Sequence, residues 1–275
     1  MKIENLINQI KQKKSFLCVG LDVDLNKIPK HLHKFDDPIF EFSKEIIDST
    51  SPFAIAYKPN VAFFESYGLK GWNSLEKVIN YINLKYPEIF TIADAKRGDI
   101  GNTSSKYAKA FFETLNFDSI TVTPYMGKDS IEPFLEYDNK HTILLSLTSN
   151  YGSSDFQFHS EKETPLYLSV IKKSQNWKNK NNLMYVVGAT KAESLKEIRK
   201  IIPNSFLLVP GIGAQGGSLS DVCKLGLNDS CGIIVNSSRE IIYCDNSRDY
   251  TKKSAEISSL MQKEMSKQLI KKGII

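Results

Sequence analysis

Eight short apolar runs along the chain restrict the fold more than any other feature. Each is rich in Val, Ile, Leu, Phe and Ala, and most are closed by a polar residue or Gly. Such continuous runs are typical of strands that are covered on both faces, as in parallel sheets. Their polar ends follow one another at intervals of 21 to 41 residues, which leaves room for a crossover helix in every gap. These ends lie near Asp22, Lys58, Asp94, Thr123, Ser149, Thr190, Gly211 and Ser237.

The gaps between the runs carry the spacing of amphipathic helices. Residues 190–202 predict a helix that opens with a capping box, in which Thr190 is the N-cap and Glu193 the third helical residue. Three further segments place apolar residues at helical intervals, namely 37–50, 74–86 and 104–115.

Eight strand–helix units in 275 residues predict an α/β fold, a TIM (β/α)₈ barrel in which residues 1–275 form a single domain. An open, doubly wound sheet is the alternative. It is disfavoured because no G-x-G-x-x-G motif follows the first run, where a dinucleotide site would need one. The Ser-rich segment 150–165 after the fifth run is interpreted either as a mobile lid or as an inert surface loop.

Composition excludes several classes of protein. With 41% hydrophobic and 24% charged residues, the chain has the profile of a soluble globular protein. Its first residues, MKIENLINQIKQKK, lack the apolar centre of a signal peptide, and no apolar run approaches the roughly 18–20 residues of a membrane span. Four cysteines without a C-x-x-C pair indicate a reducing, cytoplasmic location. The net charge of +5 is scattered, so no nucleic-acid partner is required, and four dispersed histidines predict no metal site.

The stretch DAKRGDIGNT, residues 94–103, raises the question of chemistry. In a barrel, all polar strand ends face the same rim. Asp94 and Lys96 are two residues apart, so a strand that continues through them directs both toward the barrel mouth, whereas Arg97 is expected to be a surface charge. Lys58 comes from the neighbouring second strand at the same level. A carboxylate between two ammonium groups stays ionised, which favours a preorganised acid–base cluster over a simple turn.

The pattern D-x-K-x-x-D-I-x-x-T in this stretch resembles the signature of the orotidine 5′-phosphate decarboxylase family, in its longer-chain bacterial form. GLDVD, YKPN, PGIGAQGG and NSSREI resemble the family's other motifs and occur in its order, so that the resemblance runs from about residue 15 to 245. It implies a carboxy-lyase that converts orotidine 5′-phosphate into UMP and CO₂, the final step of de novo pyrimidine biosynthesis. It also implies that the reaction uses no cofactor and no metal ion.

The resemblance assigns an alternating network of charges to Lys58, Asp94, Lys96 and Asp99. Asp94 would lie against the substrate carboxylate, and Lys96 would stabilise the charge at C6 and then protonate it. Lys58 and Asp99 would hold these two in their charge states. Since no cofactor is implied, electrostatics and binding energy must supply the catalysis.

In this family, the last Asp of the motif reaches the active site of the partner subunit. Asp99 would do so here, and Ile100 and Thr103 would lie beside the ligand in the same partner site. The resemblance therefore implies a homodimer with two shared active sites.

Three further residues match ligand-binding positions of the family. Asp22 would hold a ribose hydroxyl, and Ser149 would form a hydrogen bond with the pyrimidine. Asn60 would support the ribose or the phosphate.

The phosphate site implied by the resemblance also has a physical basis. The glycines of PGIGAQGG allow backbone N–H groups to approach an anion closely. Gln215 in this loop and Arg239 after the eighth run are the expected phosphate ligands, at the place where TIM barrels often bind phosphate. Many family members have Gly just before this Arg, whereas this chain has Ser238.

Two alternatives remain open on the sequence. One is a Mg²⁺-dependent sugar-phosphate decarboxylase or aldolase of the same barrel superfamily, such as a keto-gulonate-phosphate decarboxylase or a hexulose-phosphate synthase. Those enzymes use a carboxylate from the second strand in metal binding, and this chain has Lys58 there. The other is a non-catalytic barrel that binds a nucleotide.

Overall fold

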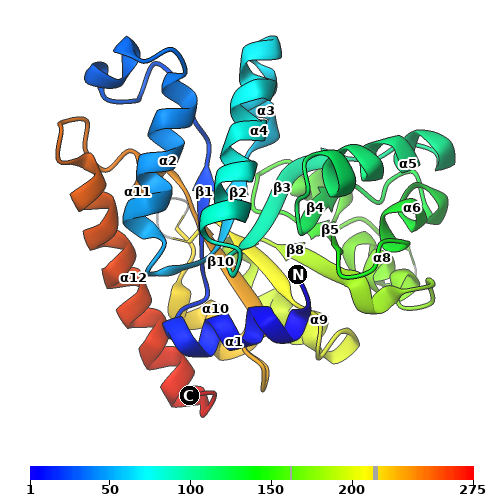
Figure 1. The fold of residues 1–275 in the computed structure, drawn as a ribbon. Coiled ribbons are helices and arrows are strands. Elements are labelled where there is room, and N and C mark those ends of the chain that lie inside the picture. The colour runs from blue at the N-terminus through cyan, green and yellow to red at the C-terminus, as the bar shows by residue number, and fades with distance from the viewer. Residues whose placement is uncertain (162, 213–215) are drawn as a thin grey trace.

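The protein forms a closed barrel of eight parallel strands, seen here in a computed structural model that describes residues 1–161, 163–212 and 216–275 (Figure 1). Each predicted apolar run contains one strand, so the (β/α)₈ barrel is confirmed. The open sheet is wrong, because the first strand pairs with both the second and the last. In barrel order the strands are β1 (Leu17–Leu21), β10 (Ile233–Ser237), β9 (Leu207–Pro210), β8 (Leu183–Val187), β5 (His141–Leu147), β4 (Ser119–Val122), β3 (Phe90–Arg97) and β2 (Ala54–Pro59).

The strands are mostly apolar, with polar residues chiefly toward their carboxyl ends, because both of their faces are covered. Every residue of β1, β2, β8 and β10 is buried, as expected where successive side chains of a strand alternate between the barrel interior and the layer of helices. Several polar side chains in this layer have partners inside the protein. The hydroxyl of the fully buried Tyr57 in β2, for example, donates to the carbonyl oxygen of Ile47 at 2.8 Å.

The helices form the outer layer of the barrel (Figure 1). α2 begins with a side-chain cap, since the Asp37 side chain accepts a hydrogen bond from the Phe40 N–H at 3.0 Å and Pro38 occupies the first turn. The α-helices are α1 (Ile3–Lys13), α2 (Pro38–Thr50), α3 (Val61–Glu65), α4 (Gly68–Lys85), α5 (Gly101–Lys109), α6 (Glu132–Leu135), α7 (Ser153–Phe156), α8 (Leu166–Ser174), α9 (Leu195–Ile201), α10 (Leu219–Gly226), α11 (Arg239–Ile242) and α12 (Tyr250–Lys272).

The predicted helices are present, with differences at their ends. The segment 37–50 coincides with α2, 74–86 is the last part of the longer α4, and 104–115 continues from α5 into the π-helical turn η2 (Ala110–Thr114). The prediction for 190–202 is wrong in its first half. A 3₁₀ helix, η5 (Ala189–Ser194), precedes α9, and Thr190 does not cap it.

Tight packing explains why the capping signal fails before α9. A Cβ on Gly188 would lie within 3 Å of three Ser149 atoms, and a Cβ on Gly217 would lie 2.4 Å from that of Ala189. The path of the chain after β8 is therefore fixed by its neighbours, which override the local preference for an α-helical start.

The C-terminal helix α12 was not anticipated. It packs alongside α2 and α11 (Figure 1). Its buried side includes Ser254 and Ser258 as well as Met265 and Leu269, so its apolar stripe is interrupted in the sequence. Ser254 is satisfied inside the protein by donating to the carbonyl oxygen of Ile241 at 2.8 Å.

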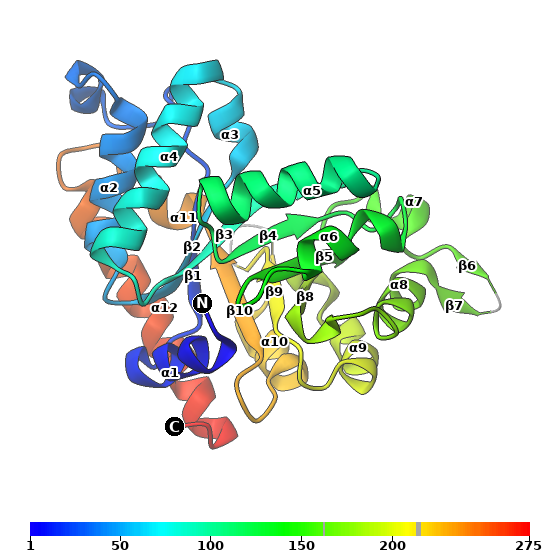
Figure 2. The same cartoon turned by 45° about the vertical axis from the view of Figure 1, so that its right-hand side comes forward.

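The segment 150–165 has structure of its own. It contains α7 and the two short strands β6 (Ser160–Glu161) and β7 (Thr164–Pro165), which pair as an antiparallel hairpin beside α8 (Figure 2). The Gln157 side chain ties this segment to the barrel rim, since its Oε1 accepts from the Thr148 N–H and its Nε2 donates to the Thr148 hydroxyl, both at 2.8 Å. In the described part of the chain, no helix is long and apolar enough to cross a membrane.

Candidate active site

Polar residues from several strand ends meet in one cavity of about 180 Å³ at the carboxyl ends of the strands. Five residues singled out from the sequence line it, namely Asp22, Lys58, Asn60, Asp94 and Arg239. The rest of its described lining comes from the two motifs PGIGAQGG and NSSREI, at the ends of β9 and β10, namely Pro210, Gly211, Ile212, Asn236, Ser237, Ser238 and Glu240.

Asp94 lies between two lysines at the centre of this group. The Lys58 Nζ contacts Asp94 Oδ2 at 2.5 Å, and the Lys96 Nζ contacts Asp94 Oδ1 at 2.5 Å. Burial alone would raise the pKa of Asp94, but the charges of the two lysines outweigh it and hold that pKa well below its usual range. Asp94 is therefore an anion at neutral pH.

The two lysines differ in their surroundings. Lys58 is buried, and burial alone would lower its pKa, but the charges of Asp94 and then Asp22 raise that pKa above its usual value. The side chain of Lys96 is 52% exposed; it does not itself line the described part of the cavity, but its Nζ contacts Asp94, which does. The pair thus offers one fixed cation that orients the carboxylate and one accessible cation that can act on a substrate.

Lys96 reaches Asp94 by a route that differs from the predicted one. The pairing of β3 with β4 shifts register between Ala93 and Arg97, and Lys96 has a φ of 47°, in the left-handed region. A residue with a Cβ adopts this conformation only where its surroundings hold it there, which is a common property of functional sites. The irregularity, rather than the alternation of a regular strand, brings both side chains together.

Arg97 is not the surface charge that the sequence suggested. Its guanidinium forms an ion pair with Glu65 at the end of α3 and lies 5.4 Å from the ring centre of Tyr107 and 5.6 Å from that of Phe111. Its side chain is only 19% exposed. Aromatic rings from α5 and η2 create this half-buried place for a cation, which the order of residues in DAKRGDIGNT does not reveal.

Asp22 has a carboxylate oxygen available for a ligand. Its Oδ1 is buried and has no hydrogen-bond partner within the described residues. Its backbone is held in place by Tyr243, whose hydroxyl donates to the Asp22 carbonyl oxygen at 2.8 Å and accepts from the Asp24 N–H at 2.7 Å. A buried acceptor without a donor fits a hydroxyl group of a ligand.

The wall formed by β1 and β10 carries the expected phosphate arginine. Arg239 begins α11, lines the cavity and is exposed. Before it, the Ser238 hydroxyl donates to the carbonyl oxygen of Gly20 at 3.0 Å. A Cβ on Gly20 would lie 2.8 Å from that of Ser238, so the missing side chain at position 20 makes room for Ser238. Gln215, the other predicted phosphate ligand, lies outside the described residues.

The remaining predicted residues lie farther out on the rim. Ser149 is half-buried and follows β5, packed against Gly188, and it does not line the cavity of the described residues. The side chain of Asp99 accepts from the Ile100 N–H at 2.8 Å. Ile100 is 58% exposed, and Thr103 is exposed in the first turn of α5. Within the described chain, these last three residues do not line the cavity of their own subunit.

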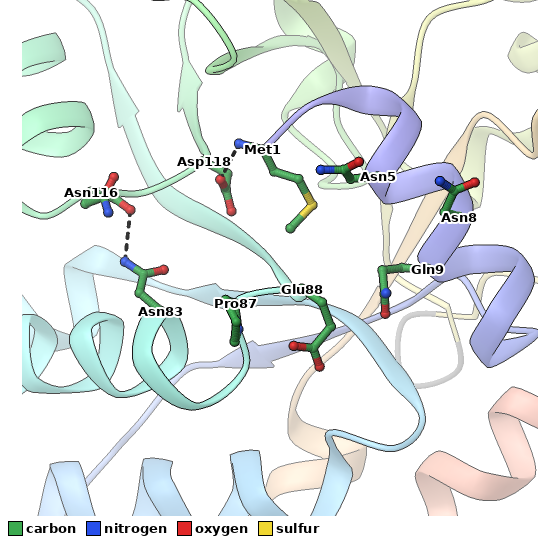
Figure 3. Close-up of a pocket in the computed structure, with 9 residues that line it drawn as sticks. All are labelled: Met1, Asn5, Asn8, Gln9, Asn83, Pro87, Glu88, Asn116 and Asp118. Atoms are coloured by element: carbon green, nitrogen blue, oxygen red, sulfur yellow. Dashed lines mark hydrogen bonds and ion pairs between the residues drawn. The ribbon is translucent and has the colours of Figure 1, made fainter.

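Another cleft, of about 530 Å³, lies at the amino ends of the strands (Figure 3). There the Met1 amino group contacts Asp118 Oδ1 at 2.5 Å, and Asp118 Oδ2 accepts from both the N–H and the hydroxyl of Thr91 at 3.0 Å. These contacts already occupy both carboxylate oxygens of Asp118. The amino end of a TIM barrel serves stability rather than catalysis, so the smaller cavity is the better candidate for an active site.

In the part of the chain that the structure describes, the cavity is built around neither a metal cluster nor a thiolate. No group of three or more His, Cys, Asp or Glu side chains suited to a metal ion occurs among the described residues. Cys18 lies near the cavity, and its Sγ is 3.5 Å from Asn236 Oδ1. Burial raises its pKa to about 12, so Cys18 remains a thiol at neutral pH.

Comparison with known proteins identifies the family of this chain. The family described as "Orotidine 5'-phosphate decarboxylase / HUMPS family" matches residues 15–253. A Flavobacterium johnsoniae protein named orotidine 5′-phosphate decarboxylase is 65% identical over 265 residues, which are 96% of this chain and 97% of that protein.

Two solved structures from Leishmania donovani share the fold. Its OMP decarboxylase has a TM-score of 0.80 at 37% identity, with 95% of this chain and 99% of that chain covered. Its UMP synthase has a TM-score of 0.82 at 38% identity, with 95% of this chain but only 57% of that longer chain covered. By the extent and identity of these matches, the chain belongs to the orotidine 5′-phosphate decarboxylase family.

Proposed function

We propose that this protein is a carboxy-lyase that converts orotidine 5′-phosphate into UMP and CO₂, the last step of pyrimidine nucleotide biosynthesis. The observation that carries the proposal is the Lys58–Asp94–Lys96 cluster at the carboxyl end of the barrel. Burying a carboxylate with two close cations costs desolvation free energy and adds little to the stability of the fold. The cluster is therefore better explained by a chemical role.

The substrate would span the cavity from Lys96 to Arg239. Its phosphate would lie against the Arg239 guanidinium, which supplies a permanently charged fork, with Gln215 as a further donor. The unpartnered Asp22 Oδ1 would accept from a ribose hydroxyl, with Asn60 beside it. Ser149, at the end of β5, would bond the pyrimidine.

In the reaction itself, the bond between C6 and the carboxylate carbon breaks and its electron pair stays on C6. Asp94 would lie beside the substrate carboxylate, and the repulsion between two anions is relieved as CO₂ departs. The ammonium group of Lys96 stabilises the charge that grows at C6 and then transfers a proton to that carbon. Lys58 keeps Asp94 ionised and oriented throughout.

Binding energy from the distant phosphate would offset the repulsion at the reacting end. A mechanism that combines phosphate binding with electrostatic repulsion at the carboxylate requires no electron-accepting cofactor. It predicts that substrates without the phosphate lose turnover as well as affinity, because the phosphate contacts are then missing when Asp94 and the substrate carboxylate are forced together.

We further propose that the active enzyme is a cytoplasmic homodimer in which residues 1–275 act as one domain. Asp99, Ile100 and Thr103 lie outside their own cavity, and the exposed side chains of Ile100 and Tyr125, 58% and 91% accessible, support an apolar contact with a second copy. In such a dimer, Asp99 would complete the charge network of the partner.

The direct test is the loss of ultraviolet absorbance as purified protein consumes orotidine 5′-phosphate. We expect turnover that persists in EDTA. Strict dependence on Mg²⁺ would favour a metal-dependent sugar-phosphate enzyme instead, and binding of UMP without any turnover would favour a non-catalytic barrel.

A further inference from the structure

We propose that Thr121 of β4 is a positioning residue that holds the Asp94–Lys96 pair in its reactive geometry. This inference rests on the proposed function for its catalytic consequence. Thr121 is 1% exposed and lies on the strand next to β3. It does not line the described part of the cavity. It acts through its single hydroxyl group, which contacts both members of the pair.

The hydrogen bonds of this hydroxyl can be assigned from its donor and acceptor capacity. Its oxygen accepts from the backbone N–H of Lys96 at 2.9 Å. Its one hydrogen has two possible acceptors, Asp94 Oδ1 at 3.3 Å and the carbonyl oxygen of Ala93 at 3.5 Å. The carboxylate oxygen is nearer and charged, which makes it the stronger acceptor.

The bond to the Lys96 N–H is unusual for a parallel sheet. Between Ala93 and Arg97 the register of β3 on β4 shifts, so this N–H lies at an interruption of the regular ladder. The left-handed φ of 47° at Lys96 also needs support from its surroundings. The Thr121 hydroxyl takes the place of a backbone acceptor there and stabilises the conformation.

The same hydroxyl links the two ends of Lys96. It holds the backbone of this residue, and it also contacts Asp94 Oδ1, the oxygen that binds the Lys96 Nζ at 2.5 Å. Loss of the hydroxyl therefore loosens the lysine at its backbone and loosens the carboxylate that orients its ammonium group. A proton donor displaced by a fraction of an ångström loses rate rather than affinity.

Four variants separate this role from simple packing. Thr121→Val removes the hydroxyl and keeps the volume, whereas Thr121→Ser keeps the hydroxyl and removes the methyl group. Thr121→Ala is compared with Thr121→Ser, because these two variants differ only in the hydroxyl group. Ser119→Ala is the matched control on the same strand, because the buried Ser119 hydroxyl donates at 3.1 Å to the Thr91 carbonyl oxygen, away from the cavity.

The primary measurement is kcat and KM with orotidine 5′-phosphate, together with the denaturant midpoint of each variant. We expect Thr121→Val and Thr121→Ala to lower kcat about 10- to 100-fold, the usual worth of a hydrogen bond to a charged group, with KM changed less than about threefold. Thr121→Ser should restore kcat to within about threefold of wild type, and Ser119→Ala should affect only stability.

A second measurement does not depend on activity. Backbone hydrogen exchange at Lys96 should be about tenfold faster or more in Thr121→Val than in wild type, and Thr121→Ser should restore protection. Unchanged protection would overturn the inference, and so would equal kcat in Thr121→Val and Thr121→Ser. If the wild-type protein fails to consume the substrate, the proposed function is wrong, and the exchange experiment still decides whether Thr121 holds this backbone.

Discussion

Replacing Asp94 by Asn tests the physical basis of the site directly, because it removes the charge that compensates Lys58. Lys58 is 4% exposed, and its Nζ is 2.5 Å from Asp94 Oδ2. Breaking a buried ion pair by removal of one partner leaves an uncompensated charge, which typically costs about 3–5 kcal/mol. We expect the free energy of unfolding of Asp94→Asn at neutral pH to fall by about that amount.

The pH dependence of stability gives the prediction a sign. In the wild type, the raised pKa of Lys58 contributes stability that is complete below the unfolded value of about 10.4 and is lost as the pH rises from there through the folded-state value. The lowered pKa of Asp94 stabilises the fold until the pH falls below about 3.9. Both residues therefore make their full contribution to the free energy of unfolding between about pH 3.9 and about pH 10.4.

In Asp94→Asn, burial acts on Lys58 without its closest counter-charge and lowers the pKa of Lys58. The unfolded chain then binds more protons than the folded one, so stability rises with pH. The deficit relative to wild type should shrink between about pH 7 and pH 9.5.

Urea unfolding followed by circular dichroism measures these free energies. The double variant Lys58→Met/Asp94→Asn should recover most of the loss, because both charges of the buried pair are then removed. The control is Glu197→Gln, which removes an exposed ion pair with Lys200 and should leave stability unchanged. An Asp94→Asn protein as stable as wild type, or a double variant less stable than Asp94→Asn, would refute the reasoning.

Three further predictions concern catalysis. Lys96→Ala should reduce turnover at least about 1,000-fold while UMP binding by calorimetry persists, since general acid catalysis alone is worth about 100- to 10,000-fold; substantial residual activity would remove Lys96 from the donor role. Mixing inactive Asp94→Ala with inactive Asp99→Ala protein should restore part of the activity through hybrid dimers, and no recovery after verified subunit exchange would disprove shared sites. Tyr243→Phe should raise KM about 5- to 10-fold through loss of the bonds that hold the backbone at Asp22, and an unchanged KM would show that this loop needs no such support.

The sequence predicted the barrel well because two-sided burial of a strand leaves a direct trace, a continuous apolar run. It also predicted that Lys58, Asp94 and Lys96 would meet, because the ends of parallel strands lie at one rim, but it did not predict the register shift that brings Lys96 to Asp94. It could not predict α12, whose buried serines hide the apolar stripe. It could not predict the 3₁₀ helix η5 before α9 either, because that helix depends on close contacts with residues distant in the sequence.

Within the site, the residues that were missed act through contacts between elements distant in sequence. Thr121 is an ordinary strand residue until the register shift of β3 places the Lys96 N–H beside it. Tyr243 reaches back across more than two hundred residues to hold Asp22. The half-buried position of Arg97 depends in the same way on Glu65, two elements earlier. Side chains of this kind become visible only when the fold is known.

The contact between Ser238 and Gly20 joins the last barrel strand to the first, across 218 residues of sequence. The phosphate end of the proposed site is built on this closure. A growing polypeptide therefore has no complete ligand site until β10 has been synthesised and has docked against β1. Substrate cannot assist the early stages of folding on the ribosome, and it can only stabilise a barrel that has already closed.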